Sequence, residues 1–206
     1  MPDRRGCAPK FGAGVLGILL IAWGCSGPRP LNEAIRPADE QAYLAALREH
    51  PEPPRLAFYH WKARTTGRSL SEVERADQAL STTRNPFDAN RDPVAVSRGA
   101  VVYKAHCLTC HGENADGRGP TMPALLPRMD FHAFDKRFAV TLHRGAPRTW
   151  FRKINEGYTS EVVNADGSLN TMPPFKDTLA REQIWLAITY LQSLDAYAGK
   201  KAGAAE

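Results

Sequence analysis

The sequence shows little excess of one charge and no concentrated basic region. Its 206 residues include 27 Lys and Arg against 22 Asp and Glu, a formal net charge of +5. Part of this excess lies at the start of the chain: without Arg4, Arg5, Lys10 and Asp3, 24 basic residues face 21 acidic ones. Nucleic-acid binding requires lysine and arginine gathered on one face. The mixed charges therefore argue against a nucleic-acid-binding protein and describe an ordinary solvated surface.

Cysteine is also scarce, and the positions of the cysteines exclude a disulfide-rich fold. There are four of them. Cys7 and Cys25 lie near the start of the chain, and Cys107 and Cys110 lie close together. A disulfide across so short a loop would restrain almost none of the chain, since the stabilisation by a cross-link grows with the loop it closes.

The apolar run from Phe11 to Trp23 is too short for a permanent membrane span. Thirteen residues rise about 20 Å as a helix, whereas a hydrocarbon core is roughly 30 Å thick. Three basic residues precede the run, and a positive segment followed by a short apolar one is typical of an export signal. We therefore expect residues 1–24 to be a signal peptide.

The residues that end this segment, Ala22-Trp23-Gly24-Cys25, resemble a bacterial lipobox. The resemblance implies that Cys25 carries a lipid and that the protein is held on the periplasmic side of a membrane. An uncleaved apolar anchor and ordinary cleavage without a lipid are the alternatives. Residues 26–30, Ser-Gly-Pro-Arg-Pro, then form a tether that is flexible first and stiff afterwards.

Composition divides the remaining chain into an extension, a main domain and a tail. Residues 25–91 contain the tether and a stretch rich in Ala, Arg and Glu, which ends at turn-forming residues 85–90. Residues 92–198 form the main domain. Residues 199–206 are small and charged, and we predict a disordered tail there.

Two helices are predicted in the extension. The first opens at Asp39 or Glu40 and is stopped by Pro51, Pro53 and Pro54, and the second runs from Ser69 to Leu80. Ser71 and Glu74 fit a capping box at the start of the second. The aromatic cluster of residues 58–61 lies between the helices, and we expect it to pack the extension onto the main domain.

The main domain begins and ends with a predicted helix. Val94 to His106 is the first and residues 180–194 are the last. Between them we expect a loop over 112–128, helical turns in segments 131–142 and 148–158, and a turn at 164–168.

The most informative string in the sequence is Cys107-Leu108-Thr109-Cys110-His111. Its spacing lets two thiols add to the two vinyl groups of a haem, while the adjacent imidazole reaches the iron from one face. A thioredoxin-like redox pair would need a strand–turn–helix context, and a zinc site would need further clustered ligands. Chance occurrence of the pattern is the third alternative. We interpret the string as the attachment site of one covalent haem c, with His111 as an iron ligand.

The second iron ligand is expected to be a soft donor, and Met172 is the leading candidate. It lies in the segment Thr171-Met172-Pro173-Pro174-Phe175, where the two prolines stiffen the backbone that presents the sulfur. A thioether stabilises the reduced iron, which suits electron transfer. Met122 and Met129 follow the attachment motif too closely to reach the opposite face, whereas His132 or His143 would give a bis-imidazole site.

The main domain resembles the class I mono-haem cytochromes c. In that family a Gly and an aromatic residue precede the attachment motif, each four residues apart, as do Gly99, Tyr103 and Cys107 here. The resemblance implies that the first helix crosses the last closely, with Tyr190-Leu191 as the partner contact. It covers residues 93–197 and implies an all-α, cytochrome c-like helical domain around one haem, with the N-terminal helical extension outside it.

Two further segments carry roles implied by the resemblance. Gly117-Arg118-Gly119-Pro120 is similar to the family's Gly-x-Gly-Pro turn, in which the proline carbonyl accepts a hydrogen bond from the proximal histidine. Residues 127–131, Pro-Arg-Met-Asp-Phe, look like a segment of a bacterial subgroup in which Arg128 meets a haem propionate. Weaker candidates for the haem rim are Arg148, Trp150 and Tyr158.

These expectations describe an electron-transfer protein rather than an enzyme. With His111 and Met172 both bound, iron has no open position for a substrate. Redox proteins of unknown identity are the expected partners, together with the membrane. The alternatives are a haem-based sensor or enzyme with an open or displaceable sixth ligand, and a haem subunit docked permanently in a larger respiratory complex.

Overall fold

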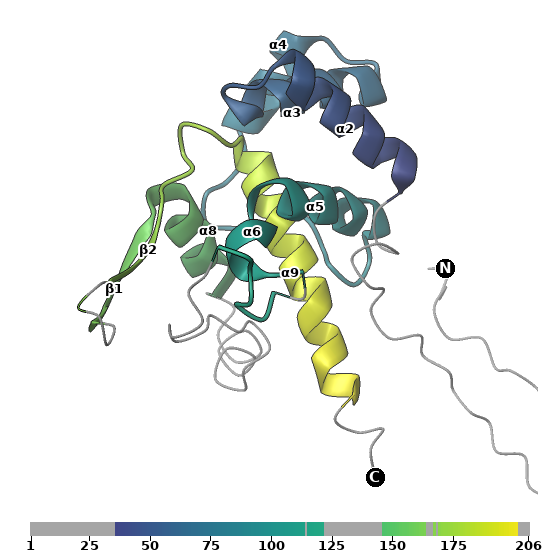
Figure 1. The fold of residues 1–206 in the computed structure, drawn as a ribbon. Coiled ribbons are helices and arrows are strands. Elements are labelled where there is room, and N and C mark those ends of the chain that lie inside the picture. The colour runs from purple at the N-terminus through teal and green to yellow at the C-terminus, as the bar shows by residue number, and fades with distance from the viewer. Residues whose placement is uncertain (1–35, 114, 122–145, 164–166, 168, 202–206) are drawn as a thin grey trace, which may run out of the picture.

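A computed structural model describes residues 36–113, 115–121, 146–163, 167 and 169–201. The described elements are mostly helices, and two short strands form a hairpin (Figure 1). In chain order they are α2 (Pro37–Glu49), α3 (Pro54–Thr66), α4 (Leu70–Gln78), α5 (Pro93–His106), α6 (Leu108–His111), α8 (Ala146–Glu156), β1 (Tyr158–Val163), β2 (Leu169–Met172) and α9 (Arg181–Lys201). The predicted all-α, cytochrome c-like class is confirmed.

Helices α5 and α9 cross each other at the centre of the molecule. The carboxylate of Asp92 caps α5 by accepting a hydrogen bond from the Ala95 amide at 2.8 Å. At the crossing, a Cβ added to Gly99 would lie 2.1 Å from the Leu186 carbonyl oxygen and 2.9 Å from Cβ of Tyr190. Only glycine permits this approach of the two backbones, as the resemblance to class I cytochromes c implied.

Large apolar side chains of α9 lie buried in the core. Trp185, Ile188 and Leu191 are at most 4% exposed. Phe151 of α8 packs on Trp185 with their ring centroids 4.5 Å apart. A second part of the core thus forms between α8 and α9, beside the α5–α9 crossing.

The extension contains one helix more than predicted. Helix α3 begins at Pro54, which we interpreted as part of a stop signal for the preceding helix. Proline fits the first turn of a helix because the amide it lacks would have no partner there. The capping box of α4 also lies two residues earlier than predicted: Ser69 and Glu72 form it, with the Ser69 amide donating to the Glu72 carboxylate at 2.9 Å.

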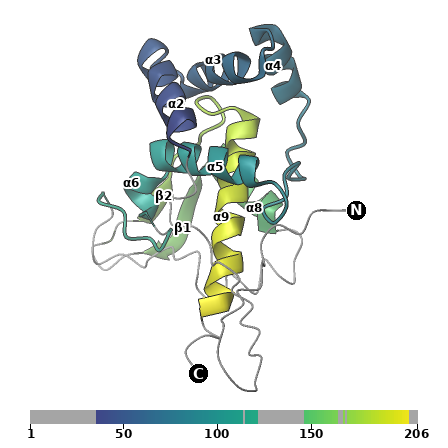
Figure 2. The same cartoon turned by 90° about the vertical axis from the view of Figure 1, so that its right-hand side faces the viewer.

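The extension packs on α5 and on the N-terminal end of α9, as the two views of the fold show (Figure 2). Phe58 and Trp61 of α3 are 1% exposed. Trp61 lies 5.2 Å from the Tyr43 ring, and the Arg98 guanidinium of α5 lies 5.4 Å from the Trp61 ring centroid. The aromatic cluster therefore joins the extension to the main domain, as expected.

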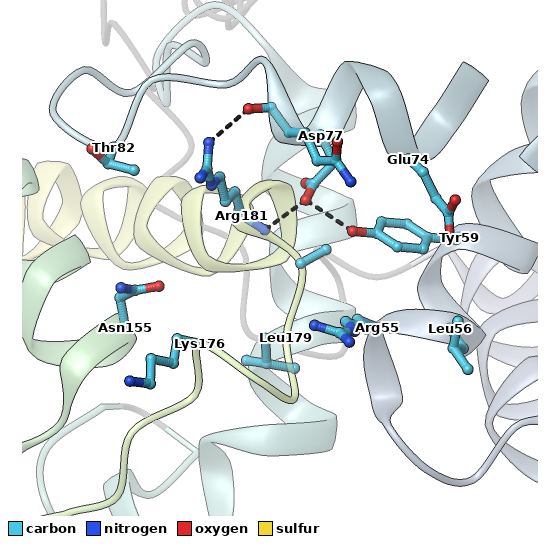
Figure 3. Close-up of a pocket in the computed structure, with 12 residues that line it drawn as sticks. Arg55, Leu56, Tyr59, Glu74, Asp77, Thr82, Asn155, Lys176, Leu179 and Arg181 are labelled. Carbon is cyan, nitrogen blue, oxygen red and sulfur yellow. Dashed lines mark hydrogen bonds between the residues drawn. The ribbon is translucent and has the colours of Figure 1, made fainter. Parts of the chain in front are cut away.

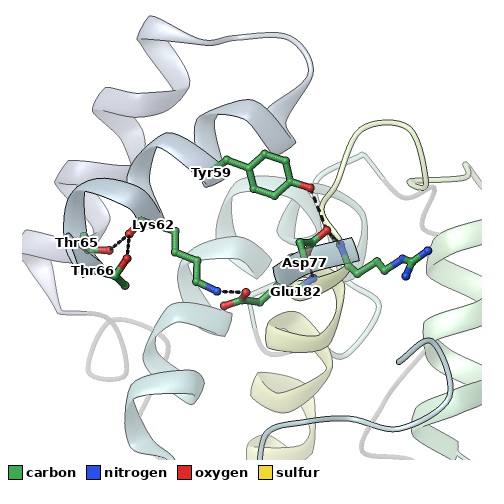
Figure 4. A network of polar contacts seen from close by, with 7 residues as sticks. Tyr59, Lys62, Thr65, Thr66, Asp77 and Glu182 are labelled. Atoms are coloured by element: carbon green, nitrogen blue, oxygen red, sulfur yellow. Dashed lines mark hydrogen bonds and ion pairs between the residues drawn. The ribbon is translucent and has the colours of Figure 1, made fainter. Parts of the chain in front are cut away.

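Polar contacts reinforce this junction (Figure 4). Asp77 of α4 is 4% exposed and accepts hydrogen bonds from the Tyr59 hydroxyl at 3.0 Å and from the backbone amides of Arg181 and Glu182 at 3.1 and 2.7 Å. Lys62 of α3 pairs with Glu182. Because the first amides of a helix have no partner within it, Asp77 serves as a cap for α9 from outside that helix.

Strands β1 and β2 pair antiparallel and form a hairpin that we did not predict. The expected turn at 164–168 lies between them, largely outside the described residues. Tyr158 opposes Met172 in this pairing. The segment over 148–158 is helical only up to Glu156, after which the chain turns into β1.

The last helix is longer than predicted and ends at Lys201 rather than near Leu194. Residues 199–201, which we placed in a disordered tail, therefore belong to α9. The remainder of that tail, the expected signal peptide, Cys25 and the tether lie outside the described residues. Within the described part of the chain, no helix combines the length and the apolar character that crossing a membrane requires.

Candidate haem-binding site

The attachment motif lies where α5 ends and a short helix begins. Cys107 closes α5 through a hydrogen bond from its amide to the Tyr103 carbonyl at 2.8 Å. The His111 amide donates to the Cys107 carbonyl at 2.9 Å, so a single helical turn separates these two residues. The α5–α9 crossing thus holds the base of the motif, and α6 presents both cysteines and the histidine from one turn.

The two cysteines are not joined to each other. Cys107 is partly buried, and burial, followed by the neighbouring Cys110, raises the pKa of its thiol to about 12. A thioredoxin-type pair depends on a thiol whose pKa is lowered. The structure therefore disfavours that alternative, and the motif also follows a helix rather than a strand.

His111 is partly buried, and this burial lowers the pKa of its imidazole. A lowered pKa keeps the ring neutral at neutral pH, which is the form that binds a metal. The zinc alternative receives no support from the described residues, among which no group of three or more His, Cys, Asp or Glu could hold an ion.

The loop after His111 folds back against the motif. The Gly117 amide donates to the His111 carbonyl at 3.0 Å, and the Thr121 hydroxyl donates to the Thr109 carbonyl at 2.8 Å. A Cβ on Gly119 would lie 2.3 Å from the Thr109 carbonyl oxygen and 2.4 Å from the Cys110 carbonyl carbon. Pro120 sits between these two contacts and is exposed. The turn that we singled out therefore lies directly against the attachment helix.

Tyr103 joins this loop to the helix crossing. It is fully buried, and its hydroxyl donates to the Gly112 carbonyl at 2.7 Å, immediately after His111. Its ring packs on Tyr190 of α9 with centroids 5.2 Å apart. The hydroxyl of Tyr190 is itself buried, and it has no hydrogen-bond partner in the described part of the chain.

Met172 is the last residue of β2 and is partly buried. Gly157, with φ of 81°, lets the strand ends approach: a Cβ there would lie 2.9 Å from the Met172 carbonyl oxygen. The following residues attach to the end of α8, because the amides of Phe175 and Lys176 donate to the carbonyls of Ile154 and Asn155 at 3.0 and 3.1 Å. Met172 thus lies in a segment whose backbone is held on both sides.

The three weaker candidates for the haem rim, Arg148, Trp150 and Tyr158, all lie among the described residues. Trp150 is partly buried on α8, next to both parts of the core, and Arg148 is exposed on the same helix. Tyr158 is 37% exposed, with the Lys153 ammonium 3.8 Å from its ring centroid. Other predicted positions lie outside the described residues: Met122, Arg128, Met129, His132 and His143.

One set of contacts near the motif has no local signal in the sequence. The Tyr43 hydroxyl of α2 forms a hydrogen bond with His106 Nε2 at 2.7 Å and accepts one from the Gln183 side chain at 2.8 Å. His106 directly precedes Cys107. Because Tyr43 lies 63 residues before His106, only the folded chain brings the extension to the attachment segment.

The residues around the motif fit a covalently attached haem. Two unjoined cysteines and a neutral imidazole share one turn, glycine backbone closes against that turn, and a buried tyrosine hydroxyl nearby lacks a partner among the described residues. The helical fold and this site define a c-type cytochrome. It carries covalently bound haem c, an iron cofactor.

The comparisons with known proteins agree with this class. Residues 94–191 match the family described as cytochrome C oxidase, cbb3-type, subunit III. The cbb3-type cytochrome c oxidase subunit FixP of Sinorhizobium medicae is 32% identical over 100 residues, which are 48% of this chain and 30% of that protein. A nicotinate dehydrogenase subunit of Pseudomonas putida is 30% identical over 124 residues, or 60% of this chain and 9% of that protein.

The chain therefore spans less than a third of either of these relatives. No solved structure gives a significant match.

Proposed function

We propose that this protein is a single-electron carrier with one haem, whose iron is bound by His111 and Met172. The observation that supports this most is the attachment motif on α6, at the base of a cytochrome c-like helix crossing. With two strong axial ligands the iron supplies a reversible one-electron couple and leaves no position for a substrate. Catalysis at the iron is not part of the proposal.

The protein's own residues would hold this site in a fixed geometry. His111 is kept neutral by burial, and the Pro120 carbonyl is proposed to accept a hydrogen bond from the ring N–H that does not face the iron, which would fix the orientation of the ring. Met172 would be held in place by the contacts of Gly157 and by the attachment of Phe175 to α8. Arg128 is proposed to pair with a propionate. Because these contacts would restrain the ligands, the site would rearrange little between the two redox states, and little rearrangement favours rapid electron exchange.

The proposed partners are redox proteins that donate and accept electrons. Both relatives are named as subunits of larger redox enzymes, an oxidase and a dehydrogenase. We infer that this chain likewise relays electrons to or from a respiratory assembly. The aromatic residues of the extension are used within this chain, so a docking role for the extension would depend on its outer surface.

We further propose that the protein acts on the periplasmic side of a membrane, tethered through a lipid on Cys25. The variant Cys25→Ser should then move the haem protein from the membrane fraction to the soluble fraction. Continued membrane association of this variant would point to an uncleaved apolar segment or to a membrane-bound partner instead.

The proposed ligation is tested by visible spectroscopy of the haem-loaded protein, with and without carbon monoxide. We expect a low-spin spectrum with the weak far-red band of thioether-ligated oxidised haem, and no change with carbon monoxide in the reduced protein. Met172→Ala should abolish the far-red band and allow carbon monoxide to bind, while Met129→Ala serves as the matched control and should change neither. Carbon monoxide binding by the unaltered protein would instead support a sensor or an enzyme.

A further inference from the structure

We propose that a cavity between the extension and the cytochrome domain binds a small anion with two or more carboxylate or phosphate groups. The cavity has a volume of about 450 Å³. Its walls come from α3, α4, the end of α8 and the segment that leads into α9 (Figure 3). The volume lies within the range of small-molecule sites.

Three cationic side chains line this cavity: Arg55, Lys176 and Arg181. Arg55 and Lys176 form no hydrogen bond or ion pair through their side chains with any described residue. The Arg181 guanidinium donates to the carbonyls of Gln78 and Leu80 at 2.7 and 3.2 Å. Because those partners are neutral carbonyls, the Arg181 guanidinium is held in place without forming an ion pair.

The two carboxylates that line the cavity, Asp77 and Glu74, offset these charges only in part. Asp77 accepts three hydrogen bonds, from Tyr59 and from two amides at the start of α9, so its oxygens already have partners at the junction of α4 and α9. Glu74, the other lining carboxylate, forms no hydrogen bond or ion pair with a described residue. Three cationic side chains therefore face two carboxylates, so the lining keeps an excess of positive charge and attracts anions.

Neutral groups complete a lining suited to oxygen-rich anions. The side chains of Asn155 and Thr82 border the cavity from α8 and from the loop after α4, and both can donate hydrogen bonds. Leu56 and Leu179 supply apolar wall between the polar groups. An arginine presents paired donors that match a carboxylate or a phosphate, and a lysine adds a point charge.

A bound anion would bridge two parts of the chain. Arg55 belongs to the extension and already contacts the main domain, where its amide donates to the Thr178 carbonyl at 2.8 Å. Lys176 belongs to the segment that begins at Met172 and is fixed to α8. Binding to both side chains should therefore stabilise the junction and raise the melting temperature of the protein.

The proposal is tested by calorimetric titration of the haem-loaded full chain with citrate and, separately, with inorganic pyrophosphate, at constant ionic strength. We expect at least one of the two to bind at a single site and to raise the melting temperature. Arg55→Gln and Lys176→Gln should each weaken binding at least fivefold. Glu74→Gln should tighten it, because repulsion by the lining carboxylate is removed. Preference for citrate or for pyrophosphate would identify the chemical source of the anion.

Arg48→Gln is the matched control, since Arg48 is an exposed arginine of α2 that does not line the cavity. It removes the same charge and should leave binding unchanged. Absence of binding by both probes at millimolar concentration would overturn the proposal. Equal weakening by Arg48→Gln and Arg55→Gln would also overturn it, because attraction would then come from the overall charge. None of these readouts depends on how the iron is ligated.

Discussion

At the scale of single residues, Gly99 governs how closely the two central helices approach. In Gly99→Ala, the gain in helix propensity of up to about 1 kcal/mol competes with a Cβ placed 2.1 Å from the Leu186 carbonyl oxygen. That oxygen is backbone and cannot move without separating the helices, so we expect overlap to prevail and to lower the free energy of unfolding by about 1–3 kcal/mol. Urea unfolding of the haem-loaded protein measures this change in the free energy of unfolding.

A residue larger than alanine at position 99 should lower the free energy of unfolding further. Gly99→Val is therefore the graded companion to Gly99→Ala, because each added methyl group must find room at the same crossing. If Gly99→Ala were as stable as the unaltered protein, or more stable, helix propensity would outweigh the contact. The close crossing of α5 and α9 would then be incorrect.

Residues near the attachment motif differ in how well sequence reasoning finds them. Gly99, Tyr103 and Cys107 follow one another at intervals of four residues, and the resemblance of this pattern to class I cytochromes c implied the close crossing and the buried aromatic residue that the structure shows. The contact of Tyr43 with His106 has no such local signal, since a hydrogen bond between distant residues depends on how whole helices pack. Met172 remains a predicted ligand, now placed at the end of a strand.

At the scale of elements, the start of α9 depends on a carboxylate from α4. In Asp77→Asn only one oxygen remains to accept the three hydrogen bonds, and the charge that favours the helix N-terminus is lost. We expect the free energy of unfolding to fall by about 1–3 kcal/mol. Urea unfolding followed by far-ultraviolet circular dichroism measures this loss.

Glu74→Gln provides the matched control for Asp77→Asn. Glu74 lies one turn earlier on α4, and its side chain forms no hydrogen bond with a described residue, so its neutralisation should change stability by less than about 0.5 kcal/mol. Equal effects of the two substitutions would mean that charge on α4, rather than capping of α9, accounts for the loss. The cap that α4 provides for α9 would then have no energetic role.

The elements that the sequence predicted well are long segments rich in apolar residues. Helix α5 and the first part of α9 agree with prediction because each is a long apolar segment without an internal proline, and the fold buries both on most sides. Helix α3 was missed because its first residue, Pro54, follows Pro51 and Pro53, and prolines both end and begin helices. The β1–β2 hairpin was missed because its strands are short, although the turn between them was recognised.

At the scale of the whole molecule, partly buried histidines make stability depend on pH. His106 lies between the extension and the main domain, facing Tyr43, whose hydroxyl also contacts Gln183. Burial lowers the pKa of His106 to about 4, whereas the unfolded chain has the ordinary value near 6.5. Burial, and next the charge of the stacked His50, also lower the pKa of His60. In both cases folding favours the neutral ring.

The difference between the pKa of His106 in the folded and in the unfolded chain sets the direction of the pH dependence. Between about pH 6.5 and pH 4 the unfolded chain binds a proton at position 106 that the folded chain does not. The free energy of unfolding should therefore be greatest above about pH 6.5 and fall with decreasing pH, by up to about 1.4 kcal/mol per unit from this residue. Urea unfolding of the haem-loaded protein at pH 7, 6 and 5 measures the slope.

The variant His106→Gln separates this contribution from all other titrating groups. Glutamine can still form a hydrogen bond with Tyr43 but takes up no proton, so the loss of stability between pH 6.5 and pH 5 should become smaller. Identical slopes for the variant and the unaltered protein would mean that His106 is protonated as readily in the folded chain as in the unfolded one. The extension would then leave His106 open to water, contrary to the close contact of α2 with the haem-attachment segment. A smaller slope would show that folding keeps the His106 ring neutral, as its burial beside Tyr43 of the extension requires.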